Sequence, residues 1–136
     1  MNVSFNKVNS FVENLAEKKI DLSGAALTIA LTNTPHNASW SQLSDLTEVS
    51  YADCSSRVLT VSSSGQTGGT YKLVLADLTL TSSGTVGPFR YIYIYDDDST
   101  DDKLIAYYDY GSEVTLASGD TFKLDFDPTS GALTIA

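Results

Sequence analysis

The sequence predicts an all-β protein, an antiparallel β-sandwich or jelly roll of about eight strands with one short N-terminal α-helix. Apolar residues alternate with polar ones from about residue 25 to the C-terminus, and Gly, Ser, Asp and Pro clusters separate these runs. Helical spacing occurs only near the start, which argues against βαβ units. With 136 residues, we expect a single domain, 1–136, with the helix at about 5–18 and strands from about 25 onward.

The N-terminal segment is predicted to form one amphipathic helix. Ser4 is a candidate N-cap, and Lys18 and Lys19 suit the negative end of the helix dipole. Charged residues separate apolar ones that recur at helical spacing: Phe5, Val8, Phe11, Val12 and Leu15. We expect the helix to cap the sandwich; a detachable arm that docks on a partner is the alternative.

The first strand is expected at residues 27–32, where apolar residues alternate with Thr and Ala and indicate one buried face. Residues 33–56 are rich in Asn, Pro, Ser and Asp and predict a long surface loop with one helical turn near 43–46. Such long loops are often functional or ordered by partners.

Strand character returns at residues 57–61 and stops at 62–69, where seven of eight residues are Ser, Gly or Thr. We expect the latter segment to be mobile in isolation. A bulge is predicted at 76–77, because the apolar positions change from odd to even there: Tyr71, Leu73 and Leu75, then Leu78 and Leu80.

The strand at residues 89–95 is apolar on both faces, which predicts a central strand. One face carries Phe89, Tyr91, Tyr93 and Tyr95, and the other carries Ile92 and Ile94. We interpret Tyr91 and Tyr93 as core residues; a tyrosine binding platform is the alternative.

This strand is expected to pair with the one that follows residues 96–102, with partner numbers adding to 199. That register places Tyr91 opposite Tyr108 and Tyr93 opposite Ala106. It also places Arg90 opposite Asp109, and an opposite-charge cross-strand pair favours the register by about 0.2–1 kcal/mol.

Two more hairpins are predicted near the C-terminus. The turn-forming residues 118–120 suggest that Val114 and Leu116 pair with Leu124 and Phe122. The turn at 127–131, which contains Pro, leads into a final strand around residues 133–135.

The net charge of −9 is concentrated in one segment. Residues 96–127 contain ten acidic and two basic side chains, a balance of −8. Because nucleic acid backbones and anionic lipid surfaces repel such a chain, we expect no direct nucleic acid partner and no membrane, whereas basic protein surfaces become plausible partners.

No catalytic motif stands out, and we expect a protein that is not an enzyme and takes no cofactor. His36 is the single histidine and lacks a nucleophile elbow nearby. Cys54 is the single cysteine, which excludes an intramolecular disulfide and fits a small buried thiol.

The acidic run at residues 96–102 is the one candidate for metal binding. Clustered carboxylates bind calcium because hard cations take oxygen ligands, and the candidate ligands are Asp96, Asp98, Asp101 and Asp102. Their spacing departs from an EF-hand, however, and a solvated hairpin loop is the favoured interpretation.

Trp40 is the leading candidate for a partner interface. A large indole in a polar loop usually has something to cover it. His36, Leu43 and Tyr51 of the same loop are further candidates, together with Tyr107, since consecutive tyrosines in a strand point to opposite faces and one of them can reach the outer surface.

Several motifs resemble a family of small proteins encoded by tailed bacteriophages. They cover nearly the whole chain after the opening helix and consist of ALTNT at 30–34, LTE at 46–48, GTYKLVLAD at 69–77, GPFRY at 87–91, YDYG at 108–111 and FDP at 126–128. A glycine-rich stretch follows the Thr-Glu pair in that family, and Val49-Ser50-Tyr51-Ala52 stands in its place here.

Small jelly-roll proteins of such phages are similar to capsid decoration, or cement, proteins. The resemblance implies a virion protein on the capsid exterior, made in the cytoplasm of the host bacterium, that binds the major capsid protein and stabilises the shell. It further implies a homo-oligomer, dimer or trimer, whose loops at 33–56 and 62–69 become ordered on capsid subunits. A tail or fibre component and a carbohydrate-binding module are the alternatives.

Overall fold

The computed structural model describes residues 3–24 and 26–136 and confirms the predicted all-β, antiparallel sandwich with a small helix. Nine strands are described, against about eight expected. In chain order the elements are β1 (Asn6–Lys7), α1 (Phe11–Ala16), β2 (Leu27–Thr32), the 3₁₀ turn η1 (Leu43–Asp45), β3 (Val61–Thr67), β4 (Thr70–Leu75), β5 (Leu78–Thr81), β6 (Val86–Asp96), β7 (Lys103–Leu116), β8 (Thr121–Leu124) and β9 (Leu133–Ile135).

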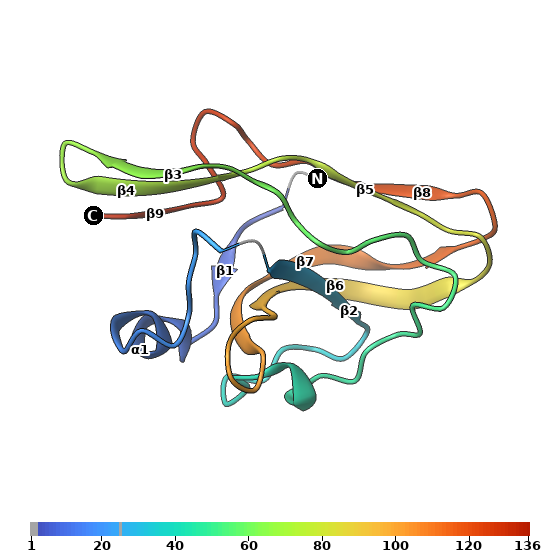
Figure 1. Cartoon of the computed structure of the whole chain (residues 1–136). Helices are drawn as coiled ribbons and strands as arrows, with labels where there is room; N and C mark the ends of the chain where they lie inside the picture. Colours follow the sequence, from blue (N-terminus) through green and yellow to red (C-terminus); the bar gives the residue numbers. More distant parts are fainter. Residues whose placement is uncertain (1–2, 25) are drawn as a thin grey trace.

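The strands form two layers (Figure 1). The lower layer is a four-stranded sheet in the order β1-β7-β6-β2, so β6 is central, as its two apolar faces predict. The upper layer contains a three-stranded sheet, β3-β4-β9, and a two-stranded sheet, β5-β8, which lie end to end. The predicted change of phase at residues 76–77 is the step from β4 to β5, between two sheets, and is not a bulge within one strand.

The main core joins side chains of both layers. Burial of this apolar surface is the main source of stability for the sandwich, at about 25 cal/mol per Å². Its fully buried members are Leu27, Ile29, Leu31, Leu80, Val86, Phe89, Ile92, Ala106 and Leu124.

A bulge corrects the predicted register between β6 and β7. The pair Tyr95–Leu104 follows the predicted numbering, but Ile105 is an extra residue in β7 and shifts the next four pairs, from Ile94–Ala106 to Tyr91–Asp109, by one. Tyr93 therefore lies opposite Tyr107 and Tyr91 opposite Asp109, so the predicted partners Ala106 and Tyr108 are wrong.

The predicted ion pair survives this shift. The Arg90 guanidinium donates from Nε to Oδ1 of Asp109 at 2.8 Å and from Nη2 to Oδ2 at 3.1 Å. A second irregularity between Phe89 and Tyr91 lets Arg90 reach a residue that is not its direct cross-strand neighbour.

Both predicted C-terminal hairpins are wrong, although their turns exist. β7 continues along β6 to Leu116, while β8 pairs with β5 and β9 pairs with β4. The turn between β7 and β8 crosses from one layer to the other. Ser82 holds it there: its amide donates to the Asp120 carbonyl, and its carbonyl accepts from Gly119.

The helix is shorter than the predicted 5–18. Asn6–Lys7 pairs with β7 as a strand, and the amide of Val8 donates to the carbonyl of Ile105 at 3.0 Å. The apolar spacing predicted a helix at Asn6–Lys7, but this segment instead hydrogen-bonds to the exposed backbone edge of β7. The helix follows Ser10, not Ser4, and buries Phe11 against the core.

Residues 62–69, predicted to interrupt the strand pattern, form most of a regular hairpin. Gly68 and Gly69 have φ values of 58° and 87°, which are those of a two-residue turn that matches the twist of the flanking strands. The glycines that suggested irregularity therefore build the turn between β3 and β4. Within the described residues, no helix has the length and hydropathy needed to cross a membrane.

Candidate functional site

A second apolar cluster lies on the outer face of the four-stranded sheet, away from the main core. Its buried members are Val8, Ala30, Leu46, Tyr91, Tyr93, Tyr95 and Leu104, with Trp40, Leu43 and Tyr107 packed against them. Burial of Tyr91 and Tyr93 confirms the core interpretation of these two residues.

The loop at residues 33–56 covers this face and corrects two predictions. All six residues of β2 are buried, where one buried face was expected, because the loop lies over the other face. Phe89 belongs to the main core and not to the tyrosine face, because the irregularity before Tyr91 reverses the alternation.

Backbone hydrogen bonds tie the loop to two strands. The amide of Leu43 donates to the carbonyl of Asp102 at 2.9 Å, and the amide of Leu104 donates to the carbonyl of Ser41 at 3.0 Å. Farther along, the hydroxyl of Thr32 donates to the Thr47 carbonyl at 2.7 Å. The predicted helical turn is present as η1 (Leu43–Asp45). These contacts position the loop on strands of this chain.

Four aromatic rings meet where the loop crosses β6 and β7, and we call His36, Trp40, Tyr93 and Tyr107 the aromatic cluster. The His36 ring stacks on Tyr107 with centroids 4.2 Å apart, and Trp40 meets His36 edge-on at 5.8 Å. Tyr93 and Tyr107 stack at 5.4 Å. Tyr93 is fully buried, whereas the other three rings are half-buried.

Burial sets the protonation behaviour of the cluster. It lowers the pKa of His36 below its ordinary value of 6.5, because removal of water disfavours the imidazolium. It raises the pKa of the Tyr93 phenol, with a further contribution from Tyr107. Both groups are therefore neutral at pH 7, which suits packing against apolar neighbours.

The structure brings four of the five sequence-predicted interface residues to this face: His36, Trp40, Leu43 and Tyr107. The register bulge at Ile105 is what turns Tyr107 to the same face as Tyr93. Tyr93 was not assigned to the candidate interface from the sequence, although this residue forms the buried base of the aromatic cluster. The available signal for an aromatic outer face was the pair of consecutive tyrosines in β7, since one of the two had to face outward.

Tyr51, the fifth candidate, has a structural setting elsewhere. Its hydroxyl donates to Oε1 of Glu48 at 2.7 Å and accepts from the amide of Leu31 at 2.9 Å. The guanidinium of Arg57 lies 3.6 Å from the centre of its ring. Tyr51 therefore fastens the end of the loop to β2.

The proposed calcium ligands do not converge on a common point. Asp96 is 3% exposed, and its carboxylate accepts the amides of Asp21 at 3.0 Å and of Asp98 at 3.1 Å. Within residues 3–24 and 26–136, no group of three or more His, Cys, Asp or Glu side chains is placed to hold a metal ion. Asp96 caps its own loop, and the side chains of Asp98 and Asp101 are exposed.

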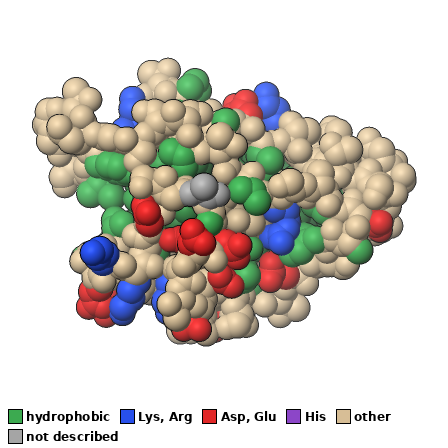
Figure 2. Space-filling model, in the orientation of Figure 1, with side chains coloured by type: hydrophobic (Ala, Val, Ile, Leu, Met, Phe, Trp, Pro, Cys, Tyr) green, Lys and Arg blue, Asp and Glu red, His purple; other side chains and the backbone are tan. Residues whose placement is uncertain are grey.

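A shallow acidic hollow borders the loop. About 360 Å³ in volume, it is lined by the apolar Leu43 and Leu46 and by the carboxylates of Glu48, Asp101 and Asp102. Burial raises the pKa of Asp102, and the nearby carboxylates of the same loop add to the effect. Acidic side chains also gather on the lower half of the face drawn in Figure 2.

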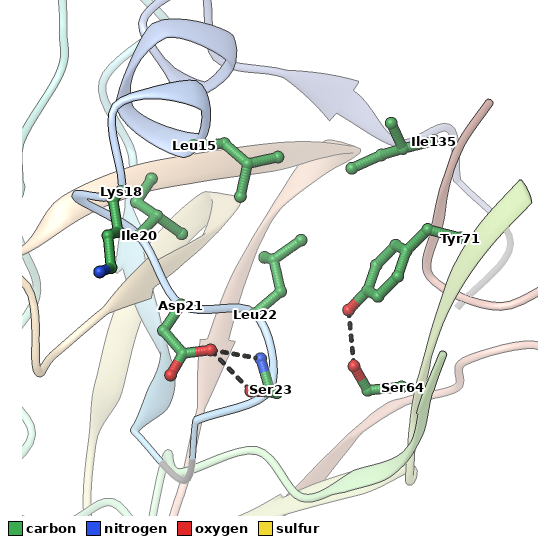
Figure 3. Close-up of a pocket in the computed structure, with 9 residues that line it drawn as sticks. All are labelled: Leu15, Lys18, Ile20, Asp21, Leu22, Ser23, Ser64, Tyr71 and Ile135. Atoms are coloured by element: carbon green, nitrogen blue, oxygen red, sulfur yellow. Dashed lines mark hydrogen bonds between the residues drawn. The ribbon is translucent and has the colours of Figure 1, made fainter. Parts of the chain in front are cut away.

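An apolar groove of about 620 Å³ opens between the layers, where α1 and the segment after it face the three-stranded sheet. Leu15, Ile20 and Leu22 line one side, and Tyr71 and Ile135 line the other (Figure 3). Two polar pairs are already formed at its rim: Tyr71 with Ser64, and Asp21 with Ser23.

Comparison with known proteins gives no relative for this chain: no family model, curated protein or solved structure matches it.

Proposed function

We propose that this chain is a non-enzymatic structural protein of a tailed-bacteriophage particle, a head decoration protein that binds the major capsid protein on the outside of the shell. The sequence resemblance motivates the proposal. Five of the six quoted motifs fall mainly on β2, β4, β6, β7 and the turn before β9, which are parts of the scaffold, and LTE at 46–48 lies in the loop after η1. The motifs therefore support a shared architecture, whereas the proposed role in capsid decoration rests on surface features.

The observation that carries the proposal is the convergence of the interface candidates on one rigid face. Trp40, His36 and Tyr107 lie together, half-exposed, on a sheet whose covering loop is fixed by backbone hydrogen bonds. Tryptophan and tyrosine are the residues most enriched at binding hot spots. A surface that is ordered before binding also loses less conformational entropy when the partner arrives.

Charge favours a basic partner surface beside these aromatic rings. The acidic hollow formed by Glu48, Asp101 and Asp102 adjoins Leu43, which packs on the same cluster. A capsid surface with an apolar contact flanked by Lys or Arg would match this pattern, and the complementary charges would mainly speed association.

Quantitative mass spectrometry of purified particles of the virus that encodes this chain tests the proposal. A copy number comparable to that of the major capsid protein supports decoration. A few copies per particle indicates a tail or fibre component, and absence from the particle contradicts both. Binding of the purified chain to a glycan array, without binding to capsids, would instead favour a carbohydrate-binding module.

A further inference from the structure

The upper layer ends in an edge strand that the chain does not cover. In the described residues, β3 hydrogen-bonds to β4 on one side and to no strand on the other. The edges of β2 and β5 are different, because loop residues pair with them: Thr28 forms an isolated bridge with Val58, and the amide of Ser55 donates to the carbonyl of Thr81 at 3.0 Å. β3 is thus the longest unprotected edge of the three-stranded sheet (Figure 1).

This edge lacks the usual devices that prevent strands of different molecules from pairing. Natural edge strands carry charges, proline or strong bulges. Val61–Thr67 contains neither a charged residue nor a proline, and residues 62–67 are exposed. Its one irregularity lies between Val61 and Ser63, at the end of the strand far from the turn.

The turn determines which backbone groups face outward. In a hairpin closed by two residues, the flanking pair Thr67 and Thr70 is hydrogen-bonded, and bonded pairs then alternate along the ladder. Gly65 therefore bonds to β4. Ser64 and Gln66 direct their N–H and C=O groups away from β4, where another strand could receive them.

Gly65 is the independent observation that points to a close neighbour. It lies in the interior of a strand, where glycine is unfavourable. It is not among the glycines with positive φ, and a Cβ built on it meets nothing within 4 Å. Nothing within the described chain therefore requires glycine at this position, whereas close approach of a second backbone is a common reason for a glycine within a strand.

We propose that β3 pairs antiparallel with β3 of a second copy, about a twofold axis at Gly65, so that Ser64 of one chain exchanges hydrogen bonds with Gln66 of the other and the two three-stranded sheets become one of six strands. Antiparallel self-pairing generates the isologous contact of a closed dimer. This inference goes beyond the proposed function and stands without it.

Charge permits a second copy as the occupant of this edge. The chain carries −9 overall, so two copies repel each other over most of their surface. The hairpin from Val61 to Leu75 holds one charged residue, Lys72, which is half-buried and donates to the Thr129 carbonyl at 3.0 Å. Two copies can meet at this neutral edge without placing carboxylates against each other.

Sedimentation equilibrium of the full chain, from about 10 µM to 1 mM, measures the pairing. Because few residues meet, we expect a weak dimer that becomes detectable at roughly 100 µM. Ser64→Pro removes the outward N–H without touching the ladder to β4 and should abolish the dimer. Ser64→Ala is the matched control: it loses the same hydroxyl contact with Tyr71 but keeps the N–H, and should dimerise like the wild type.

Cross-linking tests the register in a Cys54→Ala background, since Cys54 is the one cysteine of the chain. Gly65→Cys places two thiols opposite each other at the twofold axis and should form a disulfide dimer under mild oxidation. Ser63→Cys, on the same face of the strand, should not, because its own copy lies about 13 Å away along the partner strand. Circular dichroism confirms that each variant is folded.

Any of the following outcomes would overturn the proposal: a wild-type chain that stays monomeric up to 1 mM, a dimer that persists in a folded Ser64→Pro variant, or cross-linking at position 63 in preference to 65. Slow amide exchange at Ser64 and Gln66 that occurs only on capsids would assign the edge to a capsid strand and would equally refute self-pairing.

Discussion

Nδ1 of His36 lies 2.7 Å from the hydroxyl oxygen of Tyr93, and this hydrogen bond links the long loop to the central strand of the lower sheet. Tyr93 is the largest fully buried side chain of the described chain, and its polar end finds a partner in the loop. Nδ1 of a neutral imidazole donates to or accepts from the phenol, depending on the tautomer, whereas an imidazolium can only donate, and burial disfavours its charge. The loop that carries Trp40 is therefore coupled to the protonation of one histidine.

We predict that the domain loses stability between pH 7.5 and 5.5 through His36. Burial lowers the pKa of His36 in the folded state below 6.5, so the unfolded chain binds a proton first as the pH falls. Stability decreases where the unfolded state binds more protons, and the loss begins near pH 6.5. Urea unfolding at several pH values measures it.

His36→Gln is the control for this titration. The variant should be less stable than the wild type at pH 7.5, and the difference should shrink as the pH approaches 5.5. Both proteins keep the same carboxylates, including Asp102, whose pKa is raised by burial, and Asp109, whose pKa is lowered by Arg90, so carboxylate titration cancels in the difference. Parallel stability curves for the two proteins would contradict the prediction.

Trp40→Ala should leave the domain folded, cost about 1–2 kcal/mol of unfolding free energy and weaken attachment to capsids. The indole is half-buried against the aromatic cluster, so its removal costs less than that of a fully buried tryptophan. Co-sedimentation with capsids measures attachment. Tyr110→Ala, which removes a 39% exposed aromatic ring at another place, should bind normally. A Trp40→Ala variant that unfolds would instead assign Trp40 to the core.

The sequence predicted the strand class and the central position of β6 because side-chain alternation is a local property. It predicted that β6 pairs with β7 but could not predict the partners of β8 and β9, because the turn at residues 118–120 is compatible with a hairpin and with a step between layers. The contacts that decide are distant ones, such as the amide of Ser82 donating to the Asp120 carbonyl. The predicted helix was too long for the same reason: Asn6–Lys7 forms a strand that pairs with the distant edge of β7.

In the candidate site, too, local features were predictable from the sequence and distant contacts were not. Trp40 was recognisable because an indole in a polar loop is unusual, and Tyr107 because one of two adjacent tyrosines must face outward. Their meeting with His36 depends on the extra residue Ile105, and no feature of the sequence around Ile105 marks a bulge. Tyr51 shows the reverse, since an aromatic residue in the same loop proved to be a structural anchor.

The Arg90–Asp109 pair should contribute little to stability despite its good geometry. Both side chains are about 40% exposed, so water and salt screen the attraction. We predict a coupling energy of about 0.3–1 kcal/mol in a double-mutant cycle with alanine at each position. The coupling should decrease between 0.05 and about 1 M salt. A coupling above about 2 kcal/mol that is insensitive to salt would show that the pair is effectively buried.

Asp96→Asn should destabilise the domain by about 1–3 kcal/mol, because the buried carboxylate accepts two backbone N–H groups and an amide side chain offers one acceptor atom in place of two. Asp98→Asn is the matched control: the side chain of Asp98 is exposed, and its replacement should change the unfolding free energy by less than about 0.5 kcal/mol. Urea unfolding with and without millimolar calcium separates a structural role from ion binding. If Asp96 caps the loop, calcium leaves the wild-type curve unchanged. A stabilisation by calcium that both Asn variants abolish would restore the metal site and refute the capping role.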